Sequence, residues 1–125
     1  MPEKITVFVK SNEDSSKEAL KMIVQKGFKL EMRDLFIDSM TKDEFASIIN
    51  ATDLPAHECV RTVDKMYKKI FGEVDLTQMD KAQLFENLVK YPRLINRPIV
   101  IAGNRACIGR PPSKLEEFLS SIPKS

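Results

Sequence analysis

The sequence contains few of the residues that carry thiol or metal chemistry. It has two cysteines, Cys59 and Cys107, and one histidine, His57. The cysteines are too far apart to form a CxxC motif, and with His57 they do not have the spacing of a zinc site. We therefore expect no metal centre.

The sequence also lacks a long apolar run and a strong net charge. No segment approaches the roughly 20 apolar residues that span a bilayer, and the first residues show no secretory signal. The expected compartment is therefore the cytoplasm, where structural disulfides are rare. The formal net charge of +2 argues against the basic surface that nucleic-acid binding requires. We expect neither a membrane nor a nucleic acid as a partner.

The residues that are present are typical of one soluble domain. The chain has 125 residues, of which 42% are hydrophobic and 30% charged, enough for a single core but not for two. Residues 5–9 are β-branched or aromatic and predict a buried strand. A polar loop at 10–16 leads into a helix that ends near Gly27, and residues 29–35 alternate as a second strand. This order predicts a βαβ unit with parallel strands.

The middle of the chain, residues 41–90, is predicted to be a helical insertion within the same domain. Thr41 and Glu44 have the spacing of a capping box at the start of one helix. The hydrophobic spacing predicts a second helix over about 58–71 and a third over about 81–90.

The end of the chain returns to strands. Residues 98–102 and 106–108 are apolar and flank Gly103-Asn104, a two-residue hairpin signal. A last helix is predicted from about Ser113. The sequence thus predicts one α/β domain over 1–125, ordered βαβ, helical insertion, ββα, with a mixed four-stranded sheet.

Four short segments of the sequence indicate which type of α/β domain this is. Leu94–Val100 reads L-I-N-R-P-I-V, and Ile108–Pro112 reads I-G-R-P-P. Upstream lie the V-R-T of Val60–Thr62 and the L-V-K-Y-P of Leu88–Pro92. In order and spacing, these segments resemble the arsenate reductase (ArsC and Spx-like) family over essentially the whole chain. The resemblance implies a thioredoxin-like fold.

The resemblance fails at the residue that carries the family's chemistry. In the resembled reductases, a cysteine thiolate at the start of the first helix attacks arsenate, and glutathione and glutaredoxin then reduce the adduct. Laid in register, Glu13 stands at the position of that cysteine, and Ser16 persists. A carboxylate has no thiol redox cycle, and its negative charge disfavours an oxyanion at this position. A plainer interpretation is that Glu13 and Asp14 cap the helix.

The resemblance implies an anion site made of Arg61, Arg97 and Arg110, with Ser16. Guanidinium groups offer a permanently charged fork of donors that suits tetrahedral anions. The resemblance also implies that Pro98 follows a cis peptide bond.

Structural roles for the same arginines remain open at this point. Arg110 precedes two prolines and is suited to pin that turn, and Arg61 has Glu58 and Asp64 as nearby partners. In a third interpretation, an arginine forms an ion pair with Glu13 and the site neutralises itself.

A substitute nucleophile is the remaining route to catalysis. Cys59 is the weak candidate, because Arg61 would lower its pKa and His57 would serve as a base. Two residues apart on a helix, however, Cys59 and Arg61 would point to different sides. Cys107 falls in a predicted strand and is expected to be inert core.

Three functional hypotheses follow. The leading one is a non-catalytic module that binds a small oxyanion, glutathione or a protein, the protein being glutaredoxin or a regulatory target. The second is an active glutathione- and glutaredoxin-dependent reductase that uses Cys59. The third is an Spx-like regulator that binds another protein, although the CxxC motif of that branch is missing.

Overall fold

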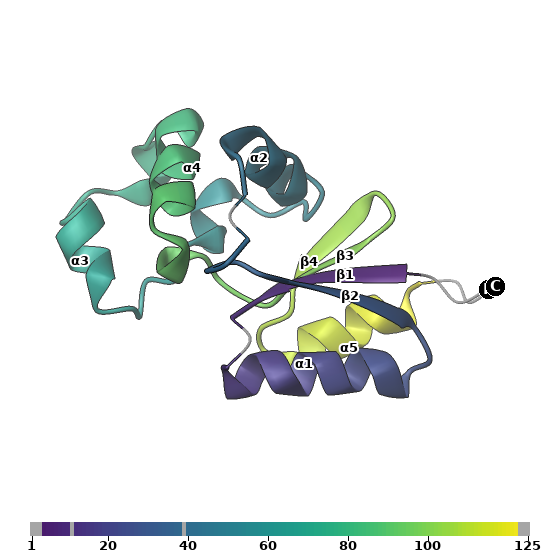
Figure 1. Cartoon of the computed structure of the whole chain (residues 1–125). Helices are drawn as coiled ribbons and strands as arrows, with labels where there is room; N and C mark the ends of the chain where they lie inside the picture. Colours follow the sequence, from purple (N-terminus) through teal and green to yellow (C-terminus); the bar gives the residue numbers. More distant parts are fainter. Residues whose placement is uncertain (1–3, 11, 39, 123–125) are drawn as a thin grey trace.

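The computed structural model describes residues 4–10, 12–38 and 40–122. Figure 1 shows an α/β fold in which the helices lie on both sides of one sheet. In chain order, the elements are β1 (Lys4–Val9), α1 (Asp14–Gln25), β2 (Lys29–Asp34), α2 (Lys42–Asn50), η1 (Ala56–Cys59), α3 (Met66–Phe71), η2 (Leu76–Gln78), α4 (Lys81–Lys90), η3 (Pro92–Leu94), β3 (Ile99–Ala102), β4 (Arg105–Ile108) and α5 (Pro112–Ser120). None of the helices in these ranges is long and apolar enough to cross a membrane.

The sheet has four strands in the order β2-β1-β3-β4. Strands β1 and β2 are parallel, with Val7 opposite Met32, whereas β1–β3 and β3–β4 are antiparallel. The β3–β4 connection is the predicted two-residue turn, with φ of +61° at Gly103. The mixed four-stranded sheet of the sequence prediction is confirmed.

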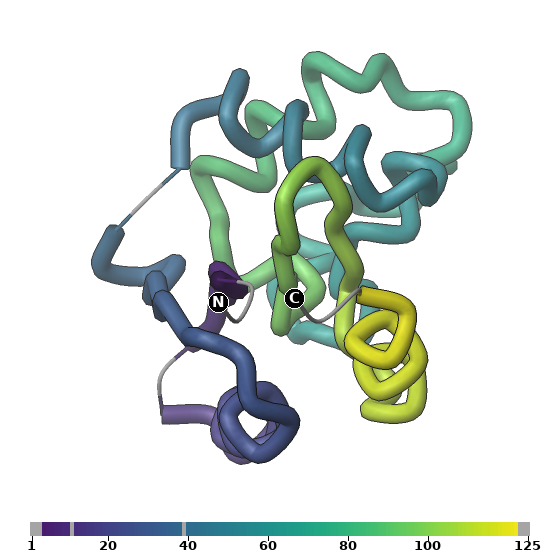
Figure 2. Tube along the Cα trace, turned by 90° about the vertical axis from the view of Figure 1, so that its right-hand side faces the viewer, coloured from purple at the N-terminus to yellow at the C-terminus, as the bar shows by residue number. Residues whose placement is uncertain are grey.

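The alternation of side chains along β1 divides the core into two layers. Ile5 and Val7 are completely buried on the side of α1 and α5. Phe8 points the other way, into the cluster formed with the helices that follow β2. Successive residues of a strand face opposite sides of the sheet, so one short strand serves both layers. Figure 2 shows the same separation, with α1 and α5 below and the helices of the middle of the chain above.

Local signals in the sequence set several helix ends. The Thr41 Oγ1 accepts a hydrogen bond from the Glu44 backbone N–H at 3.1 Å, as the capping-box pattern predicts. Gly27 takes a φ of +88° just after α1, a conformation that favours glycine. Helix α4 has the predicted bounds, and Pro92 follows it at the start of η3.

The predicted helix over residues 58–71 is wrong. The structure has a short 3-10 turn, η1, then a non-helical stretch, and only afterwards α3. Val60 forms an antiparallel bridge with Ile95, and the Arg61 backbone N–H donates to the Leu94 carbonyl at 2.7 Å. These bonds to a distant segment replace the helical ones that the local spacing favours. They also fix Arg61 beside the chain that leads to Arg97.

Candidate functional site

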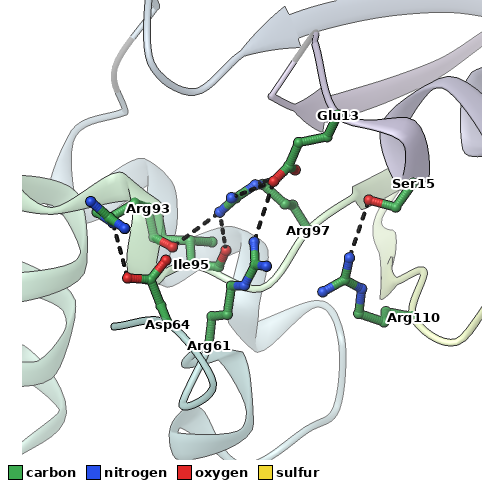
Figure 3. A network of polar contacts seen from close by, with 8 residues as sticks. All are labelled: Glu13, Ser15, Arg61, Asp64, Arg93, Ile95, Arg97 and Arg110. Carbon is green, nitrogen blue, oxygen red and sulfur yellow. Dashed lines mark hydrogen bonds and ion pairs between the residues drawn. The ribbon is translucent and has the colours of Figure 1, made fainter. Parts of the chain in front are cut away.

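Glu13 stands at the mouth of the first helix. It is the N-cap residue of α1, but its side chain makes no capping hydrogen bond. Its carboxylate turns to Arg97, whose Nε lies 2.6 Å from Oε1 and whose Nη2 lies 2.7 Å from Oε2. Figure 3 shows the two side chains meeting end to end. This is a bidentate ion pair, the strongest common form of charge-assisted hydrogen bonding.

Arg97 is a buried cation whose donors are almost fully used. Its side chain is only 3% exposed, and its Nη1 donates to the carbonyls of Arg93 and Ile95 at 3.1 and 3.0 Å. The peptide bond from Arg97 to Pro98 is cis, as the resemblance implies. A buried charge is costly unless a counter-charge compensates it, and Glu13 supplies that counter-charge.

Arg61 is the second cation on Glu13. Its Nη1 lies 3.3 Å from Glu13 Oε2, so the internal ion pair proposed from the sequence is present. Among the described residues, Arg61 forms no side-chain pair with Glu58 or Asp64. Asp64 pairs with Arg93, whose Nε lies 2.9 Å from Asp64 Oδ1.

These arginines lower the pKa of the Glu13 carboxyl. The hydrogen bond from Arg97 is the largest cause, and the charge of Arg97 and the contact with Arg61 act in the same direction. Partial burial opposes them without cancelling them. Glu13 is therefore an anion at neutral pH, and its carboxylate occupies donors of Arg97 and Arg61.

The other two residues of the predicted anion site are not part of this group. Arg110 Nη2 donates to Ser15 Oγ at 3.1 Å and lies apart from Glu13 (Figure 3). Ser16 is completely buried, and its Oγ finds no hydrogen-bond partner within the described part of the chain. The structure thus brings together Arg61 and Arg97 but leaves Arg110 and Ser16 outside the group.

A cavity of about 270 Å³ opens beside the ion pair, and we call it the Glu13 cavity. It is lined by Lys10, Glu13, Phe36, Arg61, Asp64, Arg93 and Arg97. Two cations lie near the ring of Phe36, with Lys10 Nζ at 5.2 Å and Arg97 Cζ at 5.3 Å from its centroid. The sequence interpretation missed Lys10, Phe36 and Arg93 as site residues. They come from three separate segments, and no spacing pattern links them.

Neither cysteine is prepared for nucleophilic chemistry. Cys59 is 1% exposed, its thiol donates to the Ala56 carbonyl at 2.7 Å, and burial raises its pKa to about 12. The expectation that Arg61 would lower this pKa is therefore wrong. Cys107 is half-buried, burial raises its pKa as well, and it lines a different cavity, together with Lys114 and Phe118. In the ranges that the structure describes, no group of His, Cys, Asp and Glu side chains is placed to hold a metal ion.

Comparison with known proteins identifies the family. The model of the ArsC family matches residues 8–118. The chain belongs to the ArsC family. Two relatives illustrate its range. The arsenate reductase of Haemophilus influenzae is 31% identical over 105 residues, which are 83% of this chain and 89% of the relative. The global transcriptional regulator Spx of Listeria innocua is 27% identical over 115 residues, which are 92% of this chain and 86% of the relative.

Solved structures agree on the ArsC fold. The arsenate reductase from Vibrio cholerae superposes with a TM-score of 0.85 at 22% identity, covering 94% of this chain and 98% of that one. At this identity, the likeness speaks for the fold alone. The expected thioredoxin-like fold is therefore confirmed for this ArsC-family chain, whose relatives include both a reductase and a regulator.

Proposed function

We propose that this ArsC-family protein does not reduce arsenate and instead acts as a regulatory module that binds another protein. The observation that carries the proposal is the carboxylate of Glu13, held by Arg97 at 2.6 and 2.7 Å and by Arg61 at 3.3 Å. The resemblance assigns the family's nucleophilic cysteine to the same position at the start of α1.

The residue at this position, Glu13, cannot carry out thiol-dependent reduction. A carboxylate neither forms the thiol adduct nor passes through a disulfide, so glutathione and glutaredoxin have no step to support. Cys59 does not replace the missing thiol, because it is buried and its pKa of about 12 leaves almost no thiolate at neutral pH. These features argue against the alternative of a reductase that uses Cys59.

Binding of a free oxyanion or of glutathione in the place of Glu13, on the donors of Arg97, is also disfavoured. An incoming anion must compete with a carboxylate that is part of the chain and already makes three contacts with the two arginines. It would also meet the repulsion of a like charge at short range. Protein binding is the hypothesis that does not need this anion site to be open. The similarity to the regulator Spx over 92% of the chain supports it.

The proposal is tested by an arsenate reduction assay with glutathione and glutaredoxin. We expect no turnover above the protein-free background, and no change in Cys59→Ser. Turnover by the unmodified chain that disappears in Cys59→Ser would contradict the proposal.

The variant Glu13→Cys tests whether the site can activate a thiol, which an absence of turnover in the natural chain does not show. Glu13→Cys introduces a thiol beside Arg97 at the N-terminus of α1, where the helix dipole and the guanidinium favour a thiolate. We expect its pKa, followed by pH-dependent alkylation, to fall below the ordinary thiol value of about 8.5. An ordinary pKa would mean that the arginines do not form the anion site on which the proposal depends.

A further inference from the structure

The charges around the Glu13 cavity do not balance. Its lining contains four basic and two acidic side chains. Arg97 is compensated by Glu13, and Arg93 by Asp64 at 2.9 Å. Two basic residues of the lining are therefore in excess, and the cavity favours an additional negative group.

The two basic residues in excess are Lys10 and Arg61. Lys10 rests on the ring of Phe36. The guanidinium of Arg61 has one hydrogen bond within the described ranges, the 3.3 Å contact with Glu13, and its Nε is buried without a partner. A buried donor without an acceptor is unfavourable. Arg61 therefore has unused capacity for an acceptor, unlike Arg97.

Large apolar side chains are exposed beside these charges. Phe36 lines the cavity and is 44% exposed, and its neighbour Ile37 is 84% exposed. Val63, which lies in the chain between the lining residues Arg61 and Asp64, is 81% exposed. Single exposed apolar residues are common on protein surfaces, but several exposed apolar residues bordered by polar groups are typical of sites where proteins meet.

We infer that the Glu13 cavity docks an acidic side chain of a partner protein, next to an aromatic or aliphatic residue of the same partner segment. The carboxylate would face Lys10 and Arg61, and the apolar neighbour would lie on Phe36 and Ile37. A free inorganic anion would make no favourable contact with the apolar side chains. The negative charges of Glu13 and Asp64 disfavour a ligand that carries several phosphate groups. The inference rests on the proposed function and gives the chemistry of the partner.

The test is selection of random peptides displayed on phage against the immobilised full chain, with counter-selection on Lys10→Gln/Arg61→Gln. We expect the enriched peptides to carry Asp or Glu beside an apolar residue. In fluorescence anisotropy, their affinity should fall at least tenfold in the double variant, in Phe36→Ser, and when the peptide acid is changed to its amide. Lys114→Gln, which lies in other cavities, is the matched control and should leave the affinity unchanged.

Several results would overturn the inference: no enrichment, enrichment without acidic residues, affinity that the cavity variants leave unchanged, or loss of bound peptide to inorganic sulfate at an equal concentration. If the double variant does not fold by circular dichroism, Lys10→Gln alone and Phe36→Ser decide the question. The reductase assay tests the proposed function independently of peptide binding. If the chain shows no turnover and also selects no acidic peptide, the docking inference is refuted but the proposed function is not.

Discussion

Two arginines of this protein bind carboxylates in similar ways but in different surroundings. Arg33 in β2 holds Asp38 and Glu44, each at 2.9 Å, and its guanidinium covers the ring of Phe8. The Arg33 side chain is 22% exposed, with acids that are 59% and 38% exposed. Arg97 and its acid, Glu13, are only 3% and 19% exposed. Similar contact distances therefore occur in a pair at the surface and in a buried pair.

The difference lies in what happens when one partner is lost. Water can solvate Arg33 if an acid is removed, so an exposed pair contributes only about 0–1 kcal/mol. Arg97 is enclosed, and the loss of Glu13 leaves a buried charge without compensation, which costs about 3–5 kcal/mol. An arginine–carboxylate pair therefore contributes little to the free energy of unfolding at the surface, whereas breaking such a pair in the interior is strongly destabilising.

The largest effect is expected for Glu13→Ala. In a buffer without oxyanions, this variant should lose about 3 kcal/mol of unfolding free energy, at the low end of the range for a broken buried pair because Glu13 is partly exposed. Urea denaturation followed by circular dichroism measures it. A loss below about 1 kcal/mol would mean that the pair behaves like a surface one.

The pH dependence should show a smaller effect with a definite sign. Arg97 and Arg61 lower the pKa of Glu13 in the folded state, so the folded carboxyl binds its proton less readily than the unfolded one. The resulting stability is fully present above the unfolded pKa of about 4.3. It is lost as the pH falls through the lowered, folded pKa.

The comparison with Glu13→Gln isolates this contribution from the other carboxyl groups. We expect the difference in unfolding free energy between the natural chain and Glu13→Gln to shrink on acidification below about pH 4.3. Urea denaturation at a series of pH values measures it. A difference that stays constant through the acid range would contradict the lowered pKa.

The smallest effect is expected for Asp38→Asn at the exposed clamp. Because Arg33 keeps Glu44 and access to water, the loss should be within about 1 kcal/mol and should decrease further in high salt. Thermal unfolding at low and high ionic strength measures it. A loss as large as that of Glu13→Ala would remove the contrast between the two regions.

Much of the fold follows from local patterns in the sequence. The apolar run at 5–9, the hairpin signal at Gly103 and the bounds of α4 are each encoded within a few residues, and the structure has them as predicted. The helix predicted over 58–71 failed because its backbone bonds to residues 94–96, a partner too distant for periodicity to reveal.

The candidate site was predictable only in part for the same reason. The pairing of Glu13 with an arginine was one of the open interpretations, and the choice of Arg97 and Arg61 depends on contacts between residues 84 and 48 positions apart. Lys10, Phe36 and Arg93 carry no local signal for a shared cavity. Burial, which sets the pKa of Cys59, is likewise a property of the packed chain and not of its neighbours in sequence.

The function proposed for this ArsC-family protein depends on the Glu13 carboxylate occupying the anion site. Isothermal titration calorimetry with sulfate, on the natural chain and on Glu13→Ala, measures that occupancy. We expect Glu13→Ala to bind sulfate at least tenfold more tightly, and sulfate to restore part of its lost stability, by about 1.4 kcal/mol at ten times the Kd. Equal affinity in the two proteins, or no binding to Glu13→Ala, would contradict it.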